Sequence, residues 1–323
     1  MAKIICGVDV ASRSLEVRIG SDGPAHSFAN SPEGIAALAT FCRQHQVDLV
    51  AMEATGGYEK QPFSLLWAEG IPAALLHPQA VRRFAQSMGR LEKTDRIDAG
   101  VIAWFASVKQ FAPLLPPSPH LQHLQAMVTR LRQLTDLQTA QRHQRRLVTD
   151  PAVLEGFTKL LALLAAQRRQ LKATIAQHIS ADPLWHQLDQ TFRSIKGVAD
   201  CTVASLLAEL PEIGTLSNKA ISKLAGLAPL ACDSGQARGK RAIRGGRPSI
   251  RHLLFLIASV VRRFHPDFIA FQQRLSAAGK PKKVILVALA HKLLVRLNAK
   301  AREVRQQFSA PQVLSCPPNL TQS

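Results

Sequence analysis

The 323-residue sequence predicts a mixed α/β domain, followed by two long helices and a mostly helical domain. Three observations support this fold class. Strand and helix signals alternate over about the first 110 residues, which is typical of a mixed α/β sheet. Four prolines within residues 111–119 mark a domain boundary. Beyond them, apolar residues recur at the three- and four-residue spacing of amphipathic helices.

The N-terminal segment reads as strands that first form hairpins and then alternate with helices. A helix is expected to start at Ser31-Pro32, because serine is a favoured N-cap and proline suits the first helical position. The other expected helices are Glu59–Ala68, Pro78–Ser87 and Asp95–Lys109. The expected strands are Lys3–Val10, Ser14–Gly20, Ala25–Asn30, Asp48–Glu53 and Ile71–Leu76.

Two long amphipathic helices are predicted after the prolines, His120–Leu147 and Ala152–Ile179, with a break at Asp150-Pro151. Arg168 is the one polar residue that interrupts the apolar positions of the second helix. A helical hairpin within one chain and an intermolecular coiled coil explain the pattern equally well. The apolar positions are Leu121, Leu124, Val128, Leu131, Leu134 and Leu137 in the first helix, and Phe157, Leu161, Leu164, Leu171 and Ile175 in the second.

The remaining chain predicts a compact helical domain. Helices are expected up to Leu210 and over Ser249–Arg263 and Lys282–Arg305, with an irregular loop over Leu227–Gly246. The expected division is 1–112, an α/β domain; 113–182, a linker and coiled-coil arm; 183–308, a C-terminal helical domain; and 309–323, a disordered tail.

Charge is distributed unevenly along the chain. The net charge is 0 over residues 1–110, +6 over 111–196 and +13 over 197–323. This favours a catalytic module beside a polyanion-binding one, although a basic binder without chemistry fits the charge alone equally well. The five cysteines are far apart, and no long apolar run or signal-peptide profile occurs. We therefore expect a reduced, cytoplasmic protein with no membrane partner.

Four carboxylates occupy positions where strands end or a helix begins. Asp9 lies in an apolar strand, where an unused charge is costly, and Glu53 ends another strand. Asp95 and Asp98 are three residues apart at a helix start, so they share one helical face. Such hard oxygen donors suit Mg²⁺ (or Mn²⁺), which polarises a phosphodiester. Taken singly, Asp95 is explained equally well as a helix-start carboxylate that the macrodipole favours. Glu53, taken singly, could be a surface residue of an edge strand.

The local strings around this quartet resemble a known family. Gly7-Val8-Asp9, Met52–Gly56 and Lys93–Ala99 (Lys-Thr-Asp-Arg-Ile-Asp-Ala) are similar to the DEDD transposases of bacterial insertion sequences, relatives of the Piv DNA invertase. The resemblance covers about residues 3–308. It implies a RuvC-like (RNase H) fold for the N-terminal domain and a C-terminal transposase domain. It also implies DNA substrates, a structured guide RNA (bridge or seek RNA), and a homodimer or homotetramer.

The same resemblance assigns a serine nucleophile to Ser234, in Asp233-Ser234-Gly235, which would form a transient phosphoserine link to DNA. Six cationic residues follow within 17 positions, where they would stabilise charge on an attacked phosphate. They are Arg238, Lys240, Arg241, Arg244, Arg247 and Arg251. A plain loop serine that forms a turn hydrogen bond is the alternative interpretation.

Other basic residues are candidate phosphate contacts. Lys196 lies in the turn Ile195–Asp200, which resembles the connector of a helix-hairpin-helix, and Gly245-Gly246 would let backbone approach a sugar-phosphate chain. Lys280, Lys282 and Lys283 form a further cluster. Only 5% of residues are aromatic, which favours recognition of backbone and A-form shape over base stacking.

The sequence therefore predicts an RNA-guided transposase or site-specific recombinase that cuts and joins DNA strands. Two alternatives remain open. One is a metal-dependent, structure-specific nuclease of the Holliday-junction type, in which Ser234 is dispensable. The other is a non-catalytic nucleic-acid-binding protein.

Overall fold

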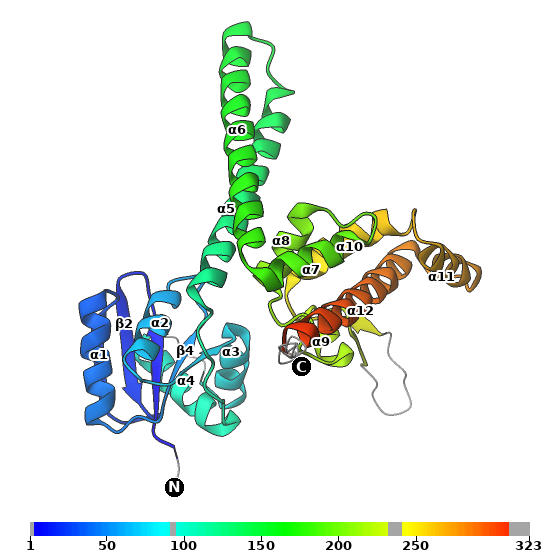
Figure 1. Ribbon diagram of the computed structural model, residues 1–323. Helices are drawn as coiled ribbons and strands as arrows, with labels where there is room; N and C mark the ends of the chain where they lie inside the picture. Colours follow the sequence, from blue (N-terminus) through cyan, green and yellow to red (C-terminus); the bar gives the residue numbers. More distant parts are fainter. Residues whose placement is uncertain (1–2, 91–94, 232–240, 310–323) are drawn as a thin grey trace, which may run out of the picture. The chain divides into compact units, whose positions relative to one another are not determined.

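The computed structural model describes residues 3–90, 95–231 and 241–309, with side chains except those of 95–98 and 309. These residues form two compact units, 1–118 and 119–323. The first is a mixed α/β sheet with helices on both faces, and the second is almost entirely helical (Figure 1). No helix in the described part of the chain combines the length and apolar character that a membrane crossing requires.

Unit 1 contains a five-stranded sheet in the order β3-β2-β1-β4-β5. β1, β2 and β3 pair antiparallel, whereas β4 and β5 continue the sheet in parallel. Its strands are β1 (Ile5–Val10), β2 (Ser14–Ile19), β3 (Ala25–Ala29), β4 (Leu49–Glu53) and β5 (Ala73–Leu76). Its helices are α1 (Pro32–Gln44), α2 (Lys60–Ala68), α3 (Pro78–Ser87) and α4 (Asp95–Lys109).

The two faces of this sheet are covered by different helices. Because successive side chains of a strand point to opposite faces, Cys6 and Val8 face one way and Ile5 and Gly7 the other. Cys6 and Val8 belong to a core cluster with residues of α1 and α2. Ile5 belongs to a second cluster with residues of α3 and α4. The side chain of Asp9, two residues after Gly7, therefore emerges on the α4 face.

Unit 2 begins with a helical hairpin of α5 (Pro119–Arg145) and α6 (Pro151–Ala181), which projects from the other helices of this unit (Figure 1). Of the two alternatives left open by the sequence, the structure shows the hairpin within one chain, and a contact between chains stays a prediction. The further elements are α7 (Pro183–Arg193), α8 (Asp200–Glu209), α9 (Asn218–Leu224), β6 (Pro229–Leu230), β7 (Ala242–Ile243), α10 (Pro248–Val261), α11 (Pro266–Ala277) and α12 (Lys282–Ser309).

The arm contains a polar layer that the apolar spacing predicted only in part. Leu134 is buried as expected, but the next inward position of α5 is Gln138, which is buried, and Leu137 is 47% exposed. The Arg168 guanidinium donates a hydrogen bond to Gln138 Oε1 across the hairpin. The polar residue that interrupts α6 therefore has a partner, and such a layer fixes the register of two packed helices.

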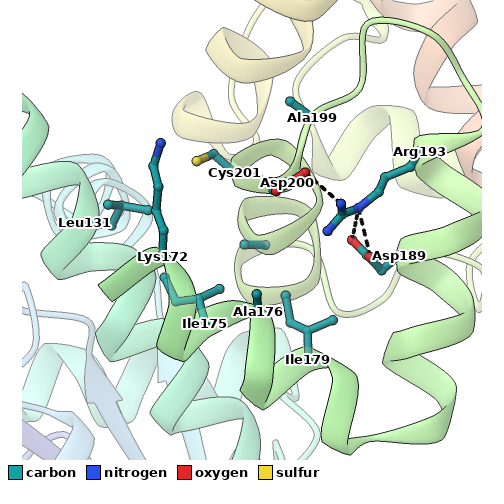
Figure 2. Close-up of a pocket in the computed structure, with 11 residues that line it drawn as sticks. Leu131, Lys172, Ile175, Ala176, Ile179, Asp189, Arg193, Ala199, Asp200 and Cys201 are labelled. Atoms are coloured by element: carbon teal, nitrogen blue, oxygen red, sulfur yellow. Dashed lines mark hydrogen bonds and ion pairs between the residues drawn. The ribbon is translucent and has the colours of Figure 1, made fainter. Parts of the chain in front are cut away.

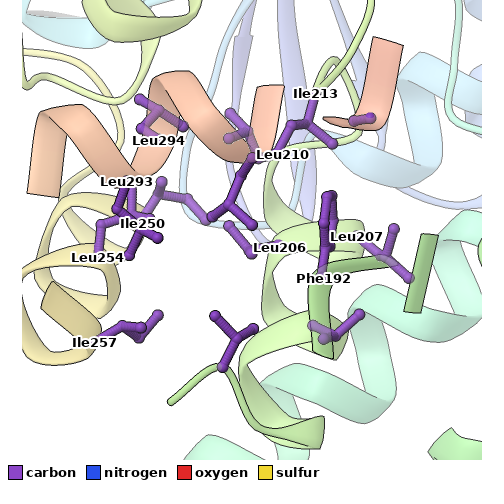
Figure 3. Close-up of a cluster of buried hydrophobic side chains, with 14 of the residues drawn as sticks. Phe192, Leu206, Leu207, Leu210, Ile213, Ile250, Leu254, Ile257, Leu293 and Leu294 are labelled. Carbon is purple, nitrogen blue, oxygen red and sulfur yellow. The ribbon is translucent and has the colours of Figure 1, made fainter. Parts of the chain in front are cut away.

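One continuous apolar core holds the arm base and the C-terminal helices together. Figure 3 shows side chains of α7, α8, α10 and α12 converging in it, among them Phe192, Leu206, Leu254 and Leu293. Leu124 and Ile175 of the arm belong to the same cluster. The base of the arm is therefore part of the C-terminal core.

We predict opposite effects for the same substitution at two glycines. An alanine Cβ at Gly7 would lie 2.0 Å from the Ala99 carbonyl oxygen, so Gly7→Ala is expected to lower the free energy of unfolding by about 1–3 kcal/mol. Gly156 of α6 has open space around it, and Gly156→Ala is expected to raise it by about 0.5–1 kcal/mol. Urea unfolding of both variants measures the difference, and a neutral Gly7→Ala would contradict this packing.

Candidate active site

Asp9 and Glu53 lie side by side at the carboxyl ends of two neighbouring parallel strands. The register pairs Gly7 with Ala51 and Val8 with Met52. The next position along both strands places Asp9 beside Glu53, with both side chains on the α4 face. The sequence predicted two strand-end carboxylates, and the sheet topology brings them together.

Gly7 allows α4 to lie directly on β1. The Ala103 nitrogen is 2.6 Å from where a Cβ of Gly7 would be, so helix backbone contacts strand backbone here. Ala99, which also contacts this position, directly follows Asp98 in the chain. The first turn of α4, from Asp95, is thereby carried over the face from which Asp9 emerges.

The quartet thus draws on β1, β4 and the start of α4. The backbones of Asp95 and Asp98 are helical as predicted, and their side chains lie outside the described residues. Among the described side chains, which do not include those of Asp95 and Asp98, no three His, Cys, Asp or Glu residues gather as metal ligands. The two described carboxylates, Asp9 and Glu53, are oxygen donors of the kind that a hard divalent cation prefers.

The loop after Glu53 is braced by Glu59, a residue that the sequence analysis did not single out. The buried Glu59 carboxylate accepts hydrogen bonds from the backbone nitrogens of Thr55, at 3.0 Å, and Gly57, at 2.8 Å. Gly56 and Gly57 have φ angles of 81° and 127°, which favour glycine. These hydrogen bonds hold the turn at the end of β4 in one conformation. The sequence feature that could have predicted this role is a glutamate six residues after Glu53.

The second predicted site lies, in the sequence, between and after the paired strands β6 and β7 of unit 2. Ser234, Arg238 and Lys240 lie outside the described residues. The strands that flank them are described: Pro229 pairs with Ile243 and Leu230 with Ala242. The two strands fix the ends of the segment that carries Ser234.

Two of the predicted phosphate-binding arginines are engaged within the protein. Arg247 donates two hydrogen bonds of 2.6 Å to the Glu212 carboxylate, and a third to the Glu209 carbonyl at 2.8 Å. Arg251 donates to the Gly245 carbonyl at 2.7 Å. Arg247 therefore holds the segment after β7 to the end of α8 and the loop after it, and Arg251 of α10 holds Gly245.

Of the two glycines that follow Arg244, one is required by a close backbone contact within the chain. A Cβ at Gly246 would lie 2.3 Å from the Gly226 nitrogen, whereas Gly245 has open space. Gly246 therefore allows the two ends of the hairpin to pack backbone on backbone. Close approach to a sugar-phosphate chain stays a prediction for Gly245.

The other candidate cations lie on the surface. Lys196 is exposed, with its Nζ 4.6 Å from the centre of the Phe264 ring. Lys196 lies in a turn with Gly197, which has a φ of 106° and packs against α10. The remaining exposed candidates are Arg241, Arg244, Lys280, Lys282 and Lys283. Their exposure is what phosphate contact requires, and that role stays a prediction.

A cavity of about 280 Å³ lies beside the start of α8 (Figure 2). Arg193 points into it and bonds Asp189 at 2.8 Å and Asp200 at 2.9 Å. Its wall also includes the apolar Ile175 and Ile179. None of the predicted site residues lines this cavity, and its charges largely neutralise one another.

Two family models match the chain, one over each predicted site. A model of the IS110-type DEDD transposases, described as a transposase, matches residues 6–152, which contain the carboxylate quartet. A model described as the transposase IS116/IS110/IS902 family matches residues 189–273, which contain Ser234. Both models describe IS110-type transposases, and together they identify the chain as a transposase. This transposase is therefore an enzyme that acts on DNA, and its DEDD family implies use of a divalent metal ion.

Similar proteins agree with this assignment. The transposase is 25% identical to the pilin gene-inverting proteins of Moraxella lacunata and Moraxella bovis, over 94% of this chain and 98% of each relative. It is also 29% identical to an uncharacterized 43.6 kDa protein of insertion element IS110 from Streptomyces coelicolor, over 47% of this chain and 37% of that one. The matches to the pilin gene-inverting proteins span both units.

We predict that the ion pair of Glu212 with Arg247 stabilises the transposase above acidic pH. Burial alone raises the pKa of Glu212, but the hydrogen bonds and charge of Arg247, with a backbone hydrogen bond, hold that pKa below its ordinary value. The stabilisation is therefore present above the unfolded pKa of about 4.3 and is lost as pH falls through the folded pKa.

Urea unfolding of Glu212→Gln at several pH values tests this. Because about a third of each side chain is exposed, the expected loss at pH 7 is about 1–2 kcal/mol, and it shrinks toward zero as the pH falls through the folded pKa of Glu212. Glu155→Gln, which breaks the exposed pair with Lys159, is the control and should cost no more than about 0.5 kcal/mol. A loss that does not change with pH would contradict the assignment.

Proposed function

We propose that this transposase is an RNA-guided, site-specific recombinase with two catalytic centres. In one, Asp9, Glu53, Asp95 and Asp98 bind Mg²⁺ (or Mn²⁺). In the other, Ser234 is the nucleophile that links the protein to DNA. The single observation that carries the proposal is the register of β1 with β4, which sets Asp9 beside Glu53 on the face covered by α4.

The sheet supports a RuvC-like (RNase H) fold for unit 1. Three antiparallel strands followed by two parallel ones, in the order β3-β2-β1-β4-β5 with helices on both faces, agree with that fold. In this arrangement the end of β1 and the end of β4 lie at the middle of the sheet. A bound cation there would neutralise charge on a phosphodiester and polarise its phosphorus for attack.

The chemistry of Ser234 is a transfer of one phosphate ester. The Ser234 oxygen bonds to phosphorus, the phosphorus–oxygen bond to the neighbouring deoxyribose breaks, and the hydroxyl proton passes to the leaving oxygen. Joining reverses these steps, as the hydroxyl of another strand end attacks phosphorus and releases Ser234. Arg241 and Arg244, which directly precede and follow β7, are the described candidates nearest in sequence to stabilise the phosphate charge.

The charge distribution supports a structured guide RNA. The exposed cations suit a sugar-phosphate backbone, and the low aromatic content gives little surface for base stacking. Delegating sequence recognition to base pairing explains both features. A homodimer or homotetramer would bring the carboxylates of one subunit to Ser234 of another, and the full-length similarity to pilin gene-inverting proteins supports a site-specific reaction.

Strand transfer in vitro with guide RNA, DNA and Mg²⁺ tests the nucleophile. Ser234→Ala is expected to lower recombination at least about 1,000-fold, because no other group replaces the attacking oxygen. Ser259→Ala, whose hydroxyl bonds to the Leu256 carbonyl of its own helix, is the control and should retain activity. Full recombination by Ser234→Ala would overturn the assignment.

The same assay tests the carboxylates. Asp9→Asn is expected to lower strand transfer about 100- to 1,000-fold, because it removes charge that holds the cation. Asp22→Asn, on the turn after β2, is the control. A protein–DNA adduct on a denaturing gel, present in the wild type and absent in Ser234→Ala, separates recombination from nuclease action by the carboxylates alone.

A further inference from the structure

A row of polar side chains crosses the sheet of unit 1 at one level. Asp9 of β1 is the register partner of Glu16 in β2, and Glu16 is the partner of Ser27 in β3. Glu53 of β4 lies on the other side of Asp9. Three carboxylates thus stand on three adjacent strands, and only Asp9 and Glu53 belong to the quartet.

Glu16 shares the α4 face with Asp9. Directly opposite residues of antiparallel strands project to the same face of a sheet, with Cα atoms roughly 4.5–5.5 Å apart. Arg18, two residues along β2, confirms the direction, because its Cδ lies 3.1 Å from where a Cβ of Gly100 in α4 would be. Glu16 is therefore beside the quartet, under the same helix.

The Glu16 carboxylate is oriented but not neutralised. Ser27 Oγ donates a hydrogen bond of 2.7 Å to Glu16 Oε1. Among the residues that the structure describes, Glu16 forms no ion pair. Arg18 is engaged at the far end of β2, where its guanidinium donates to the Ser21 carbonyl at 3.4 Å. The hydrogen bond from Ser27 leaves the second carboxylate oxygen available.

Like charges in directly opposite positions of two strands destabilise a sheet, and a cation bound at Asp9 would reduce the repulsion between Asp9 and Glu16. We propose that Glu16 is a positioning residue of the metal site, which accepts a hydrogen bond from water bound to the cation held by Asp9 and Glu53. The inference rests on the proposed function of the quartet. Such outer partners commonly change metal affinity by 10- to 100-fold.

Titration of the full chain with Mn²⁺ alone, followed by the electron paramagnetic resonance signal of free Mn²⁺, tests this role. Glu16→Gln keeps an oxygen that accepts the Ser27 hydrogen bond and removes only the charge. Its Kd for Mn²⁺ is expected to rise about tenfold. Asp22→Asn, which removes a charge from the turn at the far end of β2, is the matched control and should change the Kd less than twofold.

Thermal unfolding without metal separates positioning from a structural role. Because Glu16→Gln relieves repulsion with Asp9, its metal-free Tm should equal or exceed that of the wild type. A lowered metal-free Tm, or a Kd within twofold of the wild type, would overturn the inference. Ser27→Ala, which leaves the charge but frees its orientation, should raise the Kd by a smaller factor than Glu16→Gln.

Asp9→Asn distinguishes this inference from the proposal on which it rests. If Asp9→Asn weakens Mn²⁺ binding and Glu16→Gln does not, Glu16 has no part in a metal site that still stands. If neither variant changes the Kd, the quartet does not bind metal and both proposals fail.

Discussion

The contact of α4 with β1 at Gly7 is the constraint on which the proposed catalytic centre depends. Helix backbone lies where any side chain larger than hydrogen would have to be. This contact brings the first turn of α4 over the ends of β1 and β4. Strand pairing places Asp9 and Glu53 together, and the absence of a side chain at Gly7 allows the backbone of α4 to pack over them.

A second constraint shapes the basic half. Some of its cationic side chains form hydrogen bonds or ion pairs within the protein, and others are exposed to solvent. Arg247 ties the segment after β7 to the end of α8, Arg251 of α10 holds Gly245, and Arg168 supports the interior of the arm. The overall charge of +19 therefore overstates the surface available to nucleic acid. The exposed remainder, near the β6–β7 hairpin and at the start of α12, is where phosphate contact is expected.

Much of the fold could be predicted because its signals are local. The cap at Ser31, the break at Asp150-Pro151 and the start of α4 are all written in a few adjacent residues. The inward position of Gln138 was missed because a leucine at position 137 fits the spacing almost as well. Only the partner across the hairpin, Arg168, decides between them.

The sequence singled out the members of the proposed site but not their neighbours. Strand ends and helix starts identified Asp9, Glu53, Asp95 and Asp98, because charge in an apolar context stands out. Glu16 did not stand out in the sequence, because an acidic residue is common in a strand that alternates polar and apolar residues. Its significance comes from the pairing of β1 with β2, which sequence spacing alone does not give.

Anomalous diffraction from crystals of the full chain grown with Mn²⁺ would test the central claim most directly. We expect a peak on the α4 face at the ends of β1 and β4, with Asp9 and Glu53 oxygens about 2.0–2.6 Å away. A peak confined to the opposite face of the sheet, or to unit 2, would contradict it.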